Sequence, residues 1–171
     1  MTLGFIGSGK MAAALIKGVL KSGLCKPAEI TVSDVHAPTA EKLHQETGVT
    51  VVATNAEVVG ASEAIVLAVK PADALAAIQT LTSQQMESSM RWAWKGGADK
   101  SGKLLISIVA GLPLATLEDA AGEMFRLIRV MPNTSALVLQ GASAFALGTA
   151  AVEADAELAQ RPGDRIDECD R

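Results

Sequence analysis

Gly7, Gly9 and Ala12, near the start of the chain, form the pattern Gly-x-Gly-x-x-Ala directly after a short apolar run. In this pattern the first glycine permits a tight turn, and the second lets the backbone approach a pyrophosphate. The alanine lets the following helix lie close to the strand. The free N–H groups at the start of that helix then face the phosphates. The spacing therefore predicts a dinucleotide site, and the alternative is a glycine-rich turn that only joins a strand to a helix.

Asp34 lies where such a site needs an acidic residue, about 20 residues beyond the glycine pattern. A carboxylate there can accept a hydrogen bond from a ribose 2′-hydroxyl, which favours NAD. Ser33, one residue earlier, can instead hydrogen-bond the 2′-phosphate of NADP. Asp34 also fits a helix cap or a turn near Pro38, so both interpretations stay open.

A second phosphate-binding pattern overlaps the first. The glycine and lysine positions of a P-loop are present between Gly4 and Lys10, but Met11 stands where that loop needs the hydroxyl of Ser or Thr to bind magnesium. Only residues 1–3 remain for the strand that would precede the loop. We therefore reject the P-loop interpretation.

The elements that position these residues alternate between strands and helices. The predicted strands are 3–6, 29–33, 50–53, 63–68, 104–109, 126–131 and 142–147, and the predicted helices are 11–20, 38–47, 55–60, 73–82 and 113–121. This alternation requires crossovers, which predicts an α/β fold with a doubly wound, mostly parallel sheet, a dinucleotide-binding domain of the Rossmann type. Ligands gather at the carboxyl ends of such strands, and Asp34, Asn55 and residues 69–71 all follow a predicted strand end.

Composition divides the chain into a predicted dinucleotide-binding domain over residues 1–150 and a charged tail over residues 151–171. The tail has too few apolar residues to bury much surface, so we expect it to be partly disordered. Residues 88–103, which include Trp92 and Trp94, form an atypical insertion, because connections between a helix and a strand in such domains are usually short. The insertion is either a lid over the cofactor or a segment without function.

Bulk properties exclude several classes of partner. The chain has 171 residues, of which 49% are hydrophobic and 3% aromatic, and its net charge is −4. These values argue against binding to nucleic acid or to an anionic membrane surface. Cys25 and Cys169 have no neighbours at metal-ligand spacing, so we expect reduced thiols and no metal site. No apolar stretch reaches membrane length, and a fold that begins at residue 3 leaves no room for a signal peptide, so we expect a cytoplasmic protein.

Four motifs, in this order, resemble the N-terminal cofactor domain of pyrroline-5-carboxylate reductases. They are Gly-Phe-Ile-Gly-Ser-Gly-Lys-Met-Ala at 4–12, Ala-Val-Lys-Pro at 68–71, Val-Ala-Gly at 109–111 and Arg-Val-Met-Pro-Asn-Thr at 129–134. The resemblance extends over residues 2–158 apart from the insertion, and the fourth motif is the most specific. A plain turn after a strand is the alternative for Pro132, Asn133 and Thr134.

The resemblance implies a site for NADP, with NAD possible. It places Ile6, Gly7, Ser8, Gly9, Lys10 and Met11 at the pyrophosphate, and Ser33, Asp34 and Asn55 at the adenosine side. It also places Ala68, Val69, Lys70, Pro71, Val109, Ala110 and Gly111 beside the nicotinamide. Met131 would lie next to that ring, with Asn133 and Thr134 as the catalytic residues where the imine substrate approaches.

The reaction implied by the resemblance is reduction of 1-pyrroline-5-carboxylate to L-proline, the last step of proline biosynthesis. A protonated imine accepts hydride readily, so the protein mainly has to align the reactants. His36 and His44 are predicted away from Asn133, which suits a reaction without a histidine base. Family members form homo-oligomers through a further helical domain that is missing here, so we expect a truncated form whose activity is open. The alternatives are a cofactor-binding module without catalysis and a related hydroxyacid dehydrogenase, which residues 131–134 disfavour.

Overall fold

The computed structural model describes residues 1–82, 102–132, 143–160 and 166–168, and its described strands form one eight-stranded sheet. The strands are β1 Leu3–Ile6, β2 Ile30–Ser33, β3 Thr50–Val51, β4 Ala64–Leu67, β5 Lys103–Ser107, β6 Phe125–Pro132, β7 Ser143–Leu147 and β8 Ile166–Glu168. The α-helices are α1 Lys10–Ser22, α2 Ala37–Thr47, α3 Asn55–Ala61, α4 Pro71–Thr82, α6 Leu114–Ala121 and α7 Glu153–Gln160. Two short 3₁₀ helices, Pro27–Glu29 and Gly122–Met124, precede β2 and β6.

The sheet has the strand order β3-β2-β1-β4-β5-β6-β7-β8, and only the β6–β7 pair is antiparallel. Every residue of β1, β2 and β4 is buried, as expected for parallel strands covered on both faces. The strand order reverses direction between β1 and β4. In doubly wound sheets this switch point is where ligands bind, at the carboxyl ends of the strands. The predicted fold class is confirmed.

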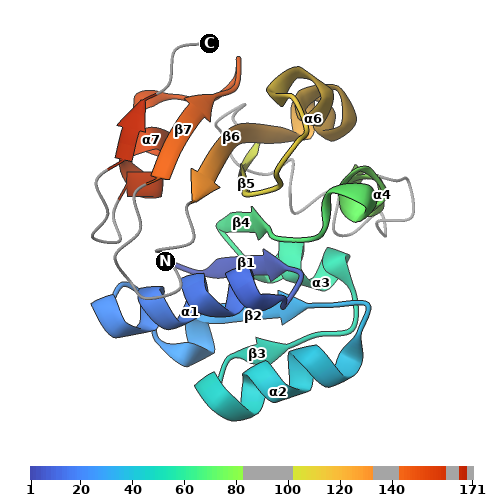
Figure 1. Cartoon of the computed structure of the whole chain (residues 1–171), viewed down its shortest axis with the longest axis vertical. Helices are drawn as coiled ribbons and strands as arrows, with labels where there is room; N and C mark the ends of the chain where they lie inside the picture. Colours follow the sequence, from blue (N-terminus) through green and yellow to red (C-terminus); the bar gives the residue numbers. More distant parts are fainter. Residues whose placement is uncertain (83–101, 133–142, 161–165, 169–171) are drawn as a thin grey trace.

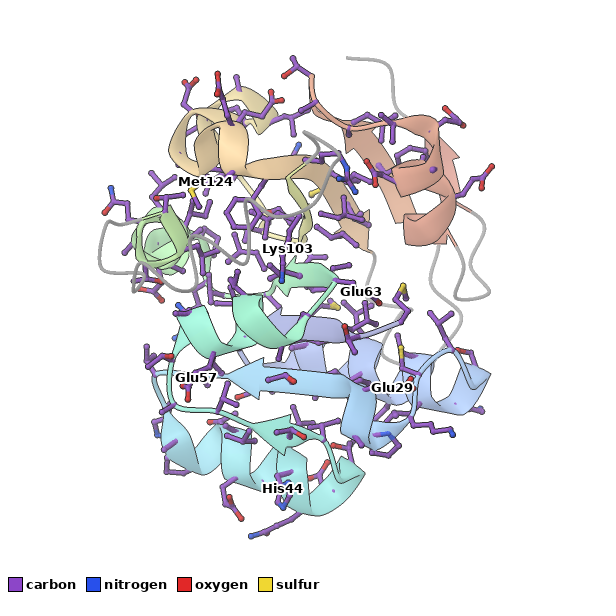
Figure 2. The ribbon with its side chains drawn as sticks, turned by 180° about the vertical axis from the view of Figure 1, so that it is seen from behind. Glu29, His44, Glu57, Glu63, Lys103 and Met124 are labelled. Carbon is purple, nitrogen blue, oxygen red and sulfur yellow. The ribbon has the colours of Figure 1, made fainter. Side chains whose placement is uncertain are left out.

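Helices cover both faces of the sheet, and on each face they pack over one apolar cluster. One cluster includes Ile16 of α1, Leu43 of α2 and Ala156 of α7. The other includes residues of α3, α4 and α6, among them Ile78 and Leu117. Figure 1 shows α1 in front of β1 and β2, and Figure 2 shows α3 on the opposite face.

Element boundaries differ from the predicted ones in a few places. β3 ends at Val51, two residues earlier than predicted, because Thr54 already caps the next helix. α4 begins at Pro71 rather than at residue 73, which suits proline because the first helical position needs no N–H donor. Lys103, counted at the end of the insertion, is the first residue of β5. The rest of the insertion that precedes residue 102 lies outside the described residues.

Part of the predicted tail has regular structure. Residues 153–160 form α7, and 166–168 form β8, which pairs in parallel with β7. Asp155 and Ala156 of α7 are buried. Arg126 on β6 donates from Nε to Oδ2 of Asp155 at 2.8 Å and from Nη2 to Oδ1 at 2.9 Å. A charged residue of α7 is therefore buried because a partner from a distant strand neutralises it.

Lys103 ties β5 to the end of α3. Its amino group donates to the carbonyl oxygen of Ser62 at 2.7 Å and to that of Val59. Figure 2 shows the Lys103 side chain directed toward α3. Burial lowers the pKa of Lys103, against the opposing effect of Glu63. The contact satisfies carbonyl groups at the carboxyl end of the helix, which lack intrahelical donors.

Candidate dinucleotide site

The ends of β2, β1, β4 and β5 lie in one row across the sheet, next to Arg129 of β6. The register pairs Ser33 with Ile6, Ile6 with Leu67, Leu67 with Ser107, and Ser107 with Arg129. The segments that follow Ser33, Ile6, Leu67 and Ser107 therefore leave the sheet at the same edge, while β6 continues there to Pro132. Those segments hold most of the predicted site residues, so the structure brings them together at the switch point.

Gly7 shapes the turn between β1 and α1. Its φ is +96°, and a Cβ built on it would lie 2.7 Å from the carbonyl oxygen of Ala68. The N–H of Gly7 donates to the carbonyl of Ser33 at 2.8 Å, and the N–H of Ala68 donates to that of Ile6 at 2.8 Å. The turn is thus held against β2 on one side and β4 on the other. Only glycine fits this conformation and this close approach.

Gly9 leaves open space at the start of α1. It is the N-cap residue, with φ −64° and no side-chain hydrogen bond, and a Cβ added there would meet nothing within 4 Å. The first turn of α1 contains no acidic residue. The first N–H groups of a helix have no intrahelical acceptor and carry partial positive charge. An anion such as a pyrophosphate fits here, next to the backbone of Gly9, Lys10 and Met11.

Asp34 links the end of β2 to the glycine turn. Its Oδ2 accepts from both the N–H and the hydroxyl of Ser8 at 2.6 Å, and its Oδ1 accepts from the N–H of His36 at 2.8 Å. Burial would raise the pKa of Asp34, but the hydrogen bonds from Ser8 and His36 outweigh it and hold the pKa below its usual value. Asp34 is therefore ionised at neutral pH. Both donors of the buried Ser8 are engaged by Asp34, so its predicted contact with the pyrophosphate needs a rearrangement.

A chain of hydrogen bonds joins Ser33 to α4. The hydroxyl of Ser33 donates to Oδ1 of Asn55 at 2.6 Å, and Nδ2 of Asn55 donates to Oγ1 of Thr80 at 2.9 Å. The Thr80 hydroxyl donates in turn to the carbonyl of Ala77 at 2.6 Å. Ser33 and Asn55, both predicted at the adenosine side, are thus in direct contact. No motif in the sequence pointed to Thr80, which lies 25 residues from Asn55 in the chain.

The position of Asn55 is fixed by the start of α3. Thr54 is the N-cap residue, and its hydroxyl accepts from the N–H of Glu57 at 3.2 Å. The Glu57 carboxylate accepts from the N–H of Thr54 at 2.8 Å, which completes a capping box. Asn55 is the first residue of the helix. Figure 2 labels Glu57 at this end of α3.

Two further turns lie beside the glycine turn. Residues 68–71 connect β4 to α4, and a Cβ on Gly7 would lie 3.1 Å from Cγ1 of Val69. Residues 109–111 follow β5, where the N–H of Ile108 donates to the carbonyl of Leu67 at 3.1 Å. The buried hydroxyl of Ser107 accepts from the N–H of Val109 at 3.3 Å, a contact that the sequence analysis missed. Gly111 has a φ of +79°. These turns form the edge predicted to face the nicotinamide.

The predicted catalytic residues Asn133 and Thr134 lie outside the described residues. Met131, which precedes them on β6, is 40% exposed, and its sulfur atom accepts from Nη2 of Arg129 at 3.3 Å. Because β6 runs parallel to β5, Met131 lies at the same edge of the sheet as the other site residues.

The two histidines have local partners. Nδ1 of His36 lies 2.7 Å from Oγ1 of Thr39, and Nδ1 of His44 lies 2.7 Å from the carbonyl oxygen of Val49. Among the described residues, no group of three or more His, Cys, Asp or Glu side chains is placed to hold a metal ion. Within the same residues, every helix is too short or too polar to cross a membrane.

The family described as NADP oxidoreductase, coenzyme F420-dependent, matches residues 2–111. The chain belongs to this family. Its relatives include the pyrroline-5-carboxylate reductase of Methanosarcina acetivorans, which is 41% identical over 157 residues, 92% of this chain and 53% of the relative. The chain spans about half the length of the curated relatives it matches. The predicted resemblance to pyrroline-5-carboxylate reductases is confirmed.

Solved structures share the fold of this chain. A pyrroline-5-carboxylate reductase from Coxiella burnetii superposes with a TM-score of 0.81 at 22% identity, over 99% of this chain and 59% of that one. The Plasmodium falciparum pyrroline carboxylate reductase, solved with NADP bound, gives a TM-score of 0.78 at 25% identity, over 99% of this chain and 58% of that one. These likenesses support the Rossmann-type fold of this family member.

Proposed function

We propose that this chain binds NADP(H), with NAD(H) as the alternative, and forms the cofactor-binding part of a pyrroline-5-carboxylate reductase. The observation that carries the proposal is the turn from Gly7 to Gly9. It lies at the switch point of the sheet and leaves open space before the N-terminus of α1. The Plasmodium falciparum structure with NADP bound supports the choice of cofactor.

The residues at the edge of the sheet would hold the cofactor in separate parts. The backbone of Gly9, Lys10 and Met11 suits the pyrophosphate, while Ser33, Asp34 and Asn55 suit the adenosine ribose. The turns at 68–71 and 109–111 would flank the nicotinamide and limit its movement. When bound, the reduced nicotinamide supplies the hydride, and the contribution of the chain is orientation and exclusion of water.

The proposed reaction is reduction of 1-pyrroline-5-carboxylate to L-proline. The curated relatives bear the name of this activity, and Met131 lies at the edge where the nicotinamide would be held. Asn133 and Thr134 remain our candidates for contact with the imine substrate. We further propose a cytoplasmic location, and assembly into a homo-oligomer for the full-length form that carries the further helical domain of the family.

Purified chain should first be titrated with NADPH and with NADH, following the fluorescence of the reduced nicotinamide. It should then be assayed for oxidation of each cofactor in the presence of the imine, with a blank that lacks protein. Binding with turnover supports the complete proposal. Binding without turnover supports the second candidate, a cofactor-binding module without catalysis. Absence of binding to either cofactor would refute both.

A further inference from the structure

We infer that Thr80 is a positioning residue that helps to set the preference between a ribose 2′-hydroxyl and a 2′-phosphate. It acts through Asn55 on the hydrogen-bonding state of Ser33. The inference rests on the proposed function, because it assigns a role at the proposed adenosine end of the cofactor site. Its carrying observation is the continuous chain of hydrogen bonds from Ala77 to Ser33.

The hydroxyl oxygen of Thr80 lies 2.6 Å from the carbonyl oxygen of Ala77. A carbonyl oxygen can only accept, so the single hydroxyl proton of Thr80 is engaged there. Toward Asn55 the same oxygen can therefore only accept. The amide group 2.9 Å away must present Nδ2, because that is the donor end of the Asn55 side chain.

The other end of the Asn55 amide is directed toward Ser33. With Nδ2 directed at Thr80, the oxygen Oδ1 faces the hydroxyl of Ser33 at 2.6 Å and must accept its proton. Ser33 is only 2% exposed, so its proton has few other acceptors. Leaving Oδ1 without a donor would be costly at this half-buried position. Ser33 is thus held as a donor to Asn55, and a cofactor that reaches this buried hydroxyl meets only its lone pairs.

Ser33 and Asp34 both offer hydrogen-bond acceptors to a cofactor. Ser33 presents lone pairs, and the ionised carboxylate of Asp34 follows it directly in the chain. Both groups can accept from a ribose 2′-hydroxyl, which has a proton to donate. A 2′-phosphate carries negative charge and acceptor oxygens at neutral pH. To bind it, Ser33 would have to withdraw its proton from Asn55, so the hydrogen-bond chain penalises NADPH relative to NADH.

Thr80→Val tests this chain because it keeps the shape of the side chain and removes the oxygen. The Asn55 amide can then turn and donate from Nδ2 to Ser33, whose proton becomes available to a phosphate. We expect the ratio of dissociation constants, NADPH over NADH, to fall about threefold to tenfold, the range for one hydrogen bond. Thr80→Ser keeps the hydroxyl and should keep the wild-type ratio.

Two controls separate positioning from general damage. Gln79→Ala changes an exposed neighbour on α4 and should leave the ratio unchanged. In a Ser33→Ala background, Thr80→Val should no longer alter the ratio, because the group through which it acts is gone. Thermal unfolding checks that each variant folds.

If Thr80→Val leaves the ratio of dissociation constants unchanged, including by weakening the binding of both cofactors equally, the inference is overturned. The proposed function still stands in that case, provided that the wild type binds a cofactor. A shift that persists without Ser33 would also overturn the inference. If the wild-type chain binds neither NADPH nor NADH, the proposed function itself fails, and the role assigned to Thr80 is wrong with it.

Discussion

Gly7 and Gly9 lie two residues apart in the turn between β1 and α1 but serve different purposes. At Gly7, the positive φ and the carbonyl of Ala68 both exclude a side chain. At Gly9, the backbone suits any residue, and only a ligand would occupy the space over its Cα. The sequence pattern assigns the first glycine to a tight turn and the second to a close approach by the pyrophosphate, and both assignments suit this geometry. The structure shows that one is required by the fold, whereas the other leaves room for binding.

Asp34→Asn should change the preference of the site between NADPH and NADH. The low pKa of Asp34 keeps its charge at neutral pH, and that charge repels a 2′-phosphate. Asparagine retains an oxygen that can accept from Ser8 or His36 but removes the charge. We expect NADPH to bind about threefold to fivefold more tightly, with little change for NADH, the magnitude of a partly solvated charge interaction.

Fluorescence titration of both cofactors measures this effect, and raising the salt concentration provides a check. Salt should reduce the difference between Asp34→Asn and the wild type, because screening weakens the same repulsion. Equal changes for NADPH and NADH would show that Asp34 acts through the conformation of the turn rather than through its charge.

At the scale of elements, the capping box of α3 holds one corner of the site. Thr54→Ala removes the hydroxyl that accepts from Glu57, and we expect a loss of about 1 kcal/mol in the free energy of unfolding. Because Asn55 is the next residue, cofactor affinity should also fall. Denaturant unfolding and cofactor titration measure the two effects.

Glu57→Gln is the matched control for Thr54→Ala. Glutamine can still accept from the N–H of Thr54, as it does in other capping boxes, so stability and affinity should stay close to wild type. If Thr54→Ala unfolds at the wild-type denaturant concentration, the capping box does not fix the start of α3.

The alternation of strands and helices was predictable because the buried parallel strands are short apolar runs bounded by turn residues. Residues 64–67 and 104–107 show this clearly. The edge that gathers Gly7, Asp34 and Asn55 followed from the same pattern. Contacts between side chains distant in sequence were not predictable, since no local pattern pairs Asn55 with Thr80 or Ser107 with Val109. Such pairs arise only when the crossovers bring their elements together.

At the scale of the whole molecule, α7 is anchored to the sheet by a buried ion pair. Asp155 lies on α7, and Arg126 lies on β6 and also donates to the carbonyl of Gly102. From the charged composition of residues 151–171 we expected little buried surface. Composition does not show that Asp155 pairs with Arg126. Ala156 of α7 thus packs in the same apolar cluster as residues of the sheet strands.

Asp155→Asn should destabilise the fold by about 2 kcal/mol near neutral pH, because it removes the carboxylate charge that accepts two hydrogen bonds from the half-buried Arg126. Burial would raise the pKa of Asp155, but the hydrogen bonds from Arg126 and Val152 outweigh it and lower the pKa. A folded pKa below the unfolded value of about 3.9 gives stability that is present above that value and lost as the pH falls through the folded pKa.

Denaturant unfolding at several pH values tests this assignment. The difference between the wild type and Asp155→Asn should be full at pH 7 and shrink as the pH falls below about 4. Glu153→Gln, on the exposed side of the same helix, should follow the wild type throughout. A difference that stays constant down to pH 2 would show that the charge of Asp155 does not contribute.

In the proposed site, a nicotinamide dinucleotide binds with its pyrophosphate over Gly9. Gly9→Ala tests this most directly, because the added Cβ meets nothing in the protein and would occupy the space assigned to the ligand. We predict that the wild type binds NADPH and that Gly9→Ala binds it at least about tenfold more weakly, with an unchanged melting temperature. Lys21→Ala, in the last turn of α1, should bind as the wild type does. Equal affinities for the wild type and Gly9→Ala would contradict the placement of the cofactor at this turn.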